Sequence, residues 1–105
     1  MIFIETDTFT KRIQTLLTDE EYSYLQAELI KRPEAGKLIS GGKGLRKLRW
    51  AGGAKGKRGG VRIIYYFYLK EWQIYMIYPF KKSEQSDLTP EQLRTLGWHV
   101  KDGVL

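Results

Sequence analysis

The sequence predicts an α+β fold: a small antiparallel β-sheet with an N-terminal αα-hairpin and a C-terminal helix packed on it. Two observations predict this class. Two helical patterns follow one another before residue 34, and three segments of strand composition lie between residues 45 and 78. The 105 residues suffice for one domain and are too few for two, so residues 1–105 are expected to form a single domain.

The first third of the chain predicts one strand and two helices. Residues 1–5 (MIFIE) favour extended structure. Apolar side chains then recur at helical spacing from Phe9 to Leu17, and Asp7 or Thr8 is the expected N-cap of that helix. The order of these elements places the two helices directly after the first strand.

The second helix has clear start and stop signals. Thr18 and Glu21 have the spacing of a capping box, in which each side chain bonds to the backbone of the other residue. The helix should end near Arg32, because Pro33 disfavours helix in the residue before it. Residues 34–44 are interpreted as a connection.

The middle of the chain predicts an antiparallel meander. Leu45–Trp50 is a strand candidate, and residues 51–60, which contain five glycines, are expected to form a flexible loop. Val61–Leu69 is apolar on both faces, as expected of a central strand. A turn at Lys70-Glu71 leads to a hairpin partner over Trp72–Tyr78.

The last predicted helix begins at Thr89. Thr89 and Gln92 form a second capping box, and Pro90 suits the first helical turn because it lacks only an N–H group that would be unpaired there. Leu93, Leu96 and Val100 are expected on its inner face.

Charge is distributed unevenly along this chain, whose formal net charge is +6. From Ala35 to Lys70 there are ten basic residues and no Asp or Glu. A solvated surface normally mixes both signs, so this one-signed segment favours a polyanionic partner, nucleic acid above all. The alternative is an ordinary solvated basic surface.

Arg62 is the notable member of this segment, because it lies inside an apolar strand on the face of Ile64 and Tyr66. Such an arginine needs a partner or lines a cleft. If the preceding strand pairs with this one, Arg46 or Lys47, with Arg49, converges on Arg62. An arginine at a strand end that reaches solvent is an equally weighted alternative.

Several classes of site are excluded or disfavoured. The chain has no cysteine, which excludes disulfides, thiolate zinc sites and a cysteine nucleophile. His99 is the only histidine and no Asp/Glu cluster has ligand spacing, so no metal or cofactor is expected. The glycine-rich segment is not a P-loop, because Ala51 and Arg58 stand where that motif needs Gly and Ser or Thr. Neither a signal peptide nor a membrane span is predicted, which fits a cytoplasmic protein without a membrane partner.

A chain of this composition can still cleave RNA, since the 2′-hydroxyl of the substrate can attack the adjacent phosphorus. The protein then has to align the strand, take one proton, stabilise the added negative charge and protonate the leaving oxygen. Arg and Lys stabilise such an oxyanion, and a Lys crowded by other cations loses its proton more easily. Aromatic side chains near the basic rim are candidates for base stacking, although most are better interpreted as core.

Five short motifs follow one another in the chain: GLRKLR (44–49), a Gly/Lys loop, KRGGVRIIYYF (57–67), FKKSE (80–84) and DLT (87–89). Together they resemble the RelE/HigB-like toxins of bacterial type II toxin–antitoxin systems, and most of all the HigB-type branch. The resemblance implies ribosome-dependent, metal-independent mRNA cleavage, with contacts to 16S rRNA. It also implies a cognate antitoxin protein that binds and silences the toxin.

The resemblance also assigns roles to residues. The catalytic candidates are Arg62, which matches the arginine expected at the scissile phosphate, and Lys82, Lys57 and Lys47. The RNA-binding candidates are Arg46, Arg49, Lys55, Arg58, Lys81 and Phe80. Phe80 stands where many relatives have Tyr and can stack but cannot exchange a proton, so the general base is not identified.

Two other functions stay open from the sequence. A non-catalytic RNA- or DNA-binding module would use the same basic surface without cutting its ligand. A ParE-like gyrase inhibitor would use the related fold against a protein target. Both are distinguished from a ribonuclease by whether mRNA is cut.

Overall fold

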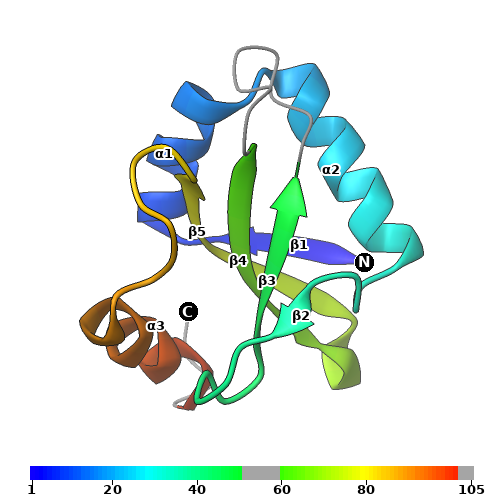
Figure 1. Ribbon diagram of the computed structural model, residues 1–105. Coiled ribbons are helices and arrows are strands. Elements are labelled where there is room, and N and C mark those ends of the chain that lie inside the picture. The colour runs from blue at the N-terminus through cyan, green and yellow to red at the C-terminus, as the bar shows by residue number, and fades with distance from the viewer. Residues whose placement is uncertain (51–59, 102–105) are drawn as a thin grey trace.

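The computed structural model describes residues 1–50 and 60–101, with side chains as far as residue 97. Five strands form one sheet in the order β1-β5-β4-β3-β2. In chain order the elements are β1 (Ile2–Glu5), α1 (Asp7–Leu16), α2 (Asp19–Lys31), β2 (Lys37–Leu38), β3 (Leu45–Trp50), β4 (Val61–Tyr68), a 3₁₀ turn (Leu69–Glu71), β5 (Gln73–Lys81) and α3 (Pro90–Lys101). Helices α1 and α2 lie on one side of the sheet, and α3 lies toward the viewer at the lower end (Figure 1).

The predicted α+β class is confirmed. β2, β3, β4 and β5 pair antiparallel, as the meander requires. One pair differs, because β1 joins the far edge of the sheet parallel to β5. The two helices between β1 and the meander provide the connection that a parallel pair needs.

Two apolar cores cover the two faces of the sheet. The larger one places Phe9 and Ile13 of α1 and Leu25 and Leu29 of α2 against alternate residues of β4, including Ile63. The second core lies on the opposite face. Its buried members are Leu45, Ile64, Ile77 and Phe80, and Leu93 and Leu96 of α3 pack on them, as predicted.

Local capping signals explain where the helices begin. The Thr18 capping box is present, with Glu21 N–H donating to Thr18 Oγ1 at 3.1 Å and Thr18 N–H donating to Glu21 Oε1 at 2.8 Å. The prediction for α1 was wrong by one or two residues. Its N-cap is Thr6, whose hydroxyl accepts from Phe9 N–H, in place of Asp7 or Thr8.

Two strand predictions need correction. The expected connection at residues 34–44 contains β2, which pairs with Lys47 and Arg46 of β3. β5 runs on to Lys81 where the sequence suggested an end at Tyr78. Pro79 is tolerated because β1 pairs only with Gln73–Met76, so no strand beside residue 79 needs an N–H from it. Side chains bond to the carbonyls on this edge: Thr6 Oγ1 donates to that of Ile77 at 2.8 Å, and Arg12 Nε to that of Pro79 at 2.9 Å.

The second capping box is also confirmed. Gln92 N–H donates to Thr89 Oγ1 at 3.1 Å, and Thr89 N–H donates to Gln92 Oε1 at 3.0 Å. This box starts α3 beside the sheet. The prediction for the side chain of Val100 lies outside the described residues.

Candidate nucleic-acid interface

The strand register brings basic residues from β3 and β4 to one face of the sheet. Arg49 pairs with Arg62, and Arg62 pairs with Phe80 of β5. One step along the sheet, Lys47 pairs with Ile64 in the same way. Residues directly opposite each other share a face, so Lys47, Arg49 and Arg62 lie together on the face opposite α1 and α2. We call these three residues the basic cluster.

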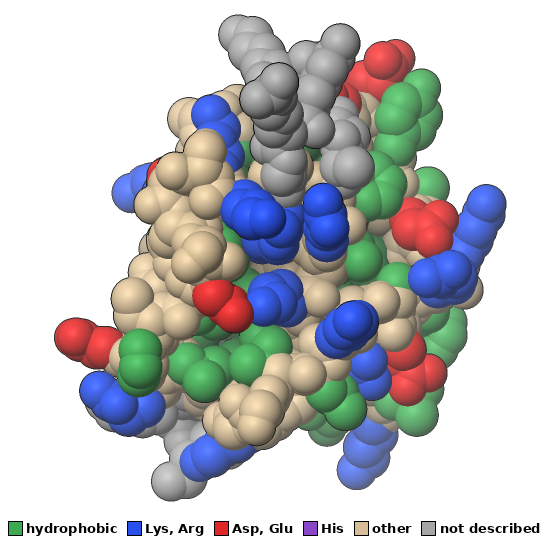
Figure 2. Space-filling model, viewed as in Figure 1, with side chains coloured by type: hydrophobic (Ala, Val, Ile, Leu, Met, Phe, Trp, Pro, Cys, Tyr) green, Lys and Arg blue, Asp and Glu red, His purple; other side chains and the backbone are tan. Residues whose placement is uncertain are grey.

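Figure 2 shows this face of the molecule. Lys and Arg side chains gather at its centre, below the grey residues, and one acidic side chain lies against them (Figure 2). Apolar side chains surround the group on its lower side. The cluster is therefore a concentrated patch of positive charge in a partly apolar surrounding.

Arg62 is the most buried member of the basic cluster, with 8% of its surface exposed. Phe80, its partner in the register, is fully buried. Burial lowers the pKa of Arg62, the charge of Arg49 lowers it further, and Asp87 opposes both effects. Arg62 therefore lies at the boundary between the core and the charged surface, as its position in an apolar strand suggested.

Asp87 is the acidic residue of this site. Its Oδ2 accepts from Lys47 Nζ at 2.9 Å, and its Oδ1 accepts from the Leu88 N–H at 2.8 Å. The hydrogen bond from Lys47 lowers the pKa of Asp87, with help from the Leu88 N–H and the charges of Lys47 and Arg62, while burial opposes them. The carboxylate is thus held ionised among the cations.

A groove of about 380 Å³ opens beside this ion pair, between β2 and the start of α3. It is lined by Lys37, Leu38, Ile39, Ser40, Lys47, Asp87, Leu88 and Leu93. Lys37 pairs with Lys47 in the register and extends the positive charge to the edge of the sheet. The basic cluster and this groove together form a continuous surface that suits a polyanion.

No family model matches the chain. The structure is similar to that of the E. coli toxin RelE, solved in the free state as a variant with two arginine-to-alanine substitutions. The TM-score is 0.62, with 17% sequence identity, over 96% of this chain and 95% of that one. The chain has a RelE-like fold. At this identity the comparison establishes the architecture, and the predicted family likeness is supported at the level of the fold.

The RelE-like sheet places some predicted site residues away from the basic cluster. Arg46 points to the other face, where its guanidinium donates to the Gly36 carbonyl at 2.8 Å and lies 3.4 Å from a Glu34 carboxylate oxygen. Lys81 pairs with Val61, in the register row of the face covered by α1 and α2. These positions give Arg46 a structural contact and separate Lys81 from the cluster.

Phe80 also differs from its expected role. It was expected to be available for stacking on RNA, but its side chain is fully buried in the second core and its ring lies 6.0 Å from that of Tyr78. Burial arises because Phe80 faces α3 and the neighbouring residues of β4. In this position Phe80 pairs with Arg62 in the strand register and belongs to the second core.

Lys82 is exposed and follows β5 directly, and its N–H donates to the Gly60 carbonyl at 3.4 Å. This contact places its backbone next to the start of β4, two residues before Arg62. Lys55, Lys57 and Arg58 lie outside the described residues. The described part of the site therefore contains Arg62, Lys47, Arg49 and Lys82.

Arg12 of α1 also supports this site, although it was not among the predicted site residues. Its Nη2 donates to Glu84 Oε1 at 2.6 Å, and its guanidinium carbon lies 5.0 Å from the centre of the Tyr78 ring. Glu84 Oε1 also accepts from the Lys81 N–H at 2.9 Å. Arg12 and Glu84 thereby fix the turn that carries Lys82. No local pattern signals this contact, because its partners are 72 residues apart.

Among the side chains of residues 1–50 and 60–97, no three of Asp or Glu gather in a way that could hold a metal ion. None of the described helices has the length and hydrophobicity that crossing a membrane demands.

Proposed function

We propose that this chain is the toxin of a type II toxin–antitoxin system and cleaves mRNA on the ribosome. The observation that carries the proposal is the basic cluster of a RelE-like sheet, on the face opposite α1 and α2. Three cations in register on a rigid sheet, with one largely buried, suit a phosphate that gains negative charge during reaction. Within this proposal the chain belongs to the HigB-type branch and acts in the cytoplasm.

In the proposed reaction the 2′-hydroxyl of one nucleotide attacks the adjacent phosphorus. The bond from phosphorus to the 5′-oxygen of the next nucleotide breaks, which leaves a 2′,3′-cyclic phosphate and a free 5′-hydroxyl. One proton leaves the 2′-hydroxyl and one is added to the 5′-oxygen, so the reaction needs a base and an acid but no cofactor.

The candidate residues have particular roles in the proposed reaction, and two of them, Lys57 and Arg58, lie outside the described residues. Arg62 and Lys82 stabilise the phosphorane, and Arg49 holds the RNA backbone together with Arg58. Lys47 or Lys57 transfers the protons. Arg62 is held in place by its buried surroundings, so little reorganisation is needed when charge develops on the phosphate.

The proposal includes two macromolecular partners. The mRNA is presented in the decoding site, where the same positive surface also contacts 16S rRNA. A cognate antitoxin protein binds the free toxin and prevents that contact. The net charge of +6 favours association with both an RNA and an acidic protein segment.

Arg62 provides the direct test. We expect Arg62→Ala to lower the rate of mRNA cleavage by about a hundredfold or more, the usual effect of removing one group that stabilises an oxyanion. Growth arrest after induction and primer extension on cellular mRNA measure toxicity and cleavage separately. Arg62→Lys retains the charge, and Lys11→Ala removes an exposed cation from α1 as a matched control.

The same experiment separates the alternative functions. If Arg62→Ala is as toxic as the wild type, the assignment of Arg62 is wrong. Intact mRNA together with gyrase-linked DNA breaks would indicate a ParE-like inhibitor. Intact mRNA with salt-sensitive RNA binding would indicate a non-catalytic module.

A further inference from the structure

A second cavity lies between the end of β5 and α3, next to the basic cluster. It has a volume of about 290 Å³ and is lined by Tyr78, Thr89, Glu91, Gln92, Thr95 and Leu96. We call it the Tyr78 pocket. Tyr78 pairs with Ile64, which pairs with Lys47, so Tyr78 is two strands from Lys47, about 10 Å between backbones. Arg62 lies on β4, the strand next to that of Tyr78. A ligand that contacts both sites need not be larger than a nucleotide or two.

The Tyr78 ring is held in a fixed position. The Arg12 guanidinium lies over the ring at 5.0 Å from its centre, and the Phe80 ring adjoins it at 6.0 Å. A planar ligand that stacks on Tyr78 therefore has to use the side that faces the pocket. A fixed aromatic surface costs a ligand little ordering of the protein.

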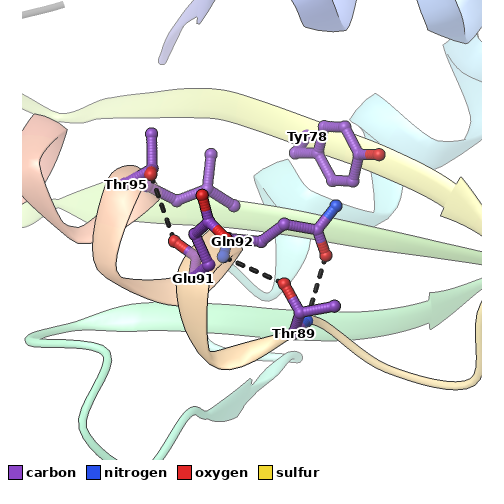
Figure 3. A pocket seen from close by; sticks show the side chains of 6 residues that line it. Tyr78, Thr89, Glu91, Gln92 and Thr95 are labelled. Atoms are coloured by element: carbon purple, nitrogen blue, oxygen red, sulfur yellow. Dashed lines mark hydrogen bonds between the residues drawn. The ribbon is translucent and has the colours of Figure 1, made fainter.

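Polar groups of α3 surround the rest of the pocket. Gln92 Oε1 accepts from the Thr89 N–H and from Gln85 Nε2 at 2.9 Å, which fixes the orientation of its amide. Figure 3 shows the amide nitrogen of Gln92 on the side of Tyr78 (Figure 3). Thr95 donates to the Glu91 carbonyl at 3.1 Å and keeps its lone pairs for a further donor. The pocket thus offers both a donor and acceptors.

The charge of the pocket indicates which part of a nucleic acid it takes. Its lining contains one carboxylate, that of Glu91, and no basic residue. A phosphate is repelled by this lining and attracted to the basic cluster beside it. A nucleobase is uncharged, stacks on an aromatic ring and presents donors and acceptors at its edge.

We propose that the Tyr78 pocket binds one unstacked nucleobase of the RNA whose phosphates lie on the basic cluster. The inference rests on the proposed function for its RNA ligand. The base stacks on Tyr78 and forms hydrogen bonds with Gln92 Nε2 and with the acceptors of Thr95 and Glu91. The carboxylate of Glu91 favours bases that carry an exocyclic amino group, since that group donates to it.

The test compares two fluorescent single-stranded probes, a short oligoribonucleotide and an abasic ribose-phosphate strand of equal length. Both carry the same phosphates, so their difference in affinity for the full chain, measured by anisotropy, reports base binding alone. We expect the wild type to bind the base-containing strand about tenfold more tightly. Tyr78→Leu should remove this difference and leave the affinity for the abasic strand unchanged.

Three further variants serve as controls. Tyr78→Phe keeps the ring and should keep the difference, and Tyr24→Leu replaces a tyrosine that is 60% exposed on α2 and should have no effect. Arg49→Ala should weaken both probes alike. Circular dichroism of each variant checks that it is folded.

The outcomes separate the inference from the proposed function. Equal wild-type affinity for the two probes would overturn the proposal that the Tyr78 pocket binds a base, and so would a Tyr78→Leu variant that retains the difference. Either result leaves the binding of phosphates by the basic cluster intact. If neither probe binds the wild type, the inference is overturned, whereas the proposed function stands or fails on primer extension with the wild type and Arg62→Ala.

Discussion

At the scale of single residues, the basic cluster is partly neutralised by one carboxylate. Asp87 accepts a hydrogen bond from Lys47 at 2.9 Å, and its charge also acts on Arg62. The carboxylate presents an ionised oxygen to these cations, as a phosphate oxygen would. An RNA phosphate therefore has to compete with Asp87 for Lys47.

This competition predicts that Asp87→Asn binds RNA more tightly. We expect affinity to rise severalfold and the salt dependence to steepen, by about 0.7 in the slope of log K against log salt for one more phosphate contact on a single strand. Anisotropy titrations at several salt concentrations measure both quantities.

Glu71→Gln is the matched control, because it makes the same change in net charge on an exposed turn at the other end of β4. An Asp87→Asn variant that binds no more tightly than Glu71→Gln would show that Asp87 does not compete with RNA. Cleavage by the Asp87→Asn variant is worth measuring as well, because the hydrogen bond to Asp87 also orients Lys47.

At the scale of elements, the strand that carries Lys47 is held by a close approach at Gly36. The Gly36 N–H donates to Tyr65 Oη at 2.8 Å, and Tyr65 Oη donates to the Pro33 carbonyl at 2.7 Å. A Cβ at Gly36 would lie 2.8 Å from Tyr65 Cε1 and 3.1 Å from the carbonyl carbon of Lys47. Only glycine lets the segment before β2 approach β3 and β4 this closely.

We therefore expect Gly36→Ala to destabilise the protein by about 1–3 kcal/mol, the usual cost of overpacking a tight site. The free energy of unfolding in urea measures it. Gly97→Ala is the control, since a Cβ there meets nothing within 4 Å in the helix α3 and should stabilise it by up to about 1 kcal/mol. A Gly36→Ala variant as stable as the wild type would mean that Tyr65 moves aside without cost.

Local sequence signals explain why some of the elements could be predicted. The helices capped by Thr18 and Thr89 are encoded by capping boxes four residues long. β3 was predictable because residues 45–50 have the composition of a strand. β2 was missed because it is only two residues long and both are exposed, so it shows no apolar pattern, although its partners in β3 are near in sequence. The end of β5 was missed because its edge contacts come from Thr6 and Arg12, 71 and 67 residues away. The sequence contains no local signal for such contacts.

The candidate site likewise has a part that could be predicted from the sequence and a part that could not. The convergence of Lys47 and Arg49 with Arg62 follows from strand alternation, so it could be anticipated once β3 and β4 were assigned. The contacts of Asp87 with Lys47 and of Arg12 with Glu84 span 40 and 72 residues and depend on the complete fold. The Tyr78 pocket likewise exists only where α3 meets β5.

At the scale of the whole molecule, the basic cluster and the acidic first turn of α2 lie on opposite sides of the sheet. The acid-free segment supplies the basic cluster, whereas the first turn of α2 carries three acidic residues on the opposite side. This separation orients the basic face toward a polyanion at long range. On the helical side, polar contacts join the helices to the sheet in addition to the larger apolar core.

Glu5 is the centre of these contacts, since it joins β1, α1 and α2. Its two carboxylate oxygens accept from Thr10 Oγ1 and Tyr22 Oη, each at 2.6 Å. Burial raises the pKa of Tyr22 well above its ordinary value of 10.0, and the hydrogen bond and charge of Glu5 raise it further, while a hydrogen bond with Gln26 opposes them. Burial also raises the pKa of Tyr65.

These shifts predict a loss of stability in alkali. A phenol whose pKa is higher in the folded state stabilises the fold fully below pH 10.0, and this contribution decreases as the pH rises above that value because the unfolded chain loses its proton first. We expect Tyr22→Phe to lower the free energy of unfolding by about 1 kcal/mol near neutral pH, through loss of the bond to Glu5. The difference from the wild type should shrink in alkali. Urea unfolding at neutral pH and at about pH 11 measures this difference. Tyr24→Phe is the control for loss of an exposed phenol. A difference between Tyr22→Phe and the wild type that stays constant across this range would show that the proton of Tyr22 does not join α2 to β1.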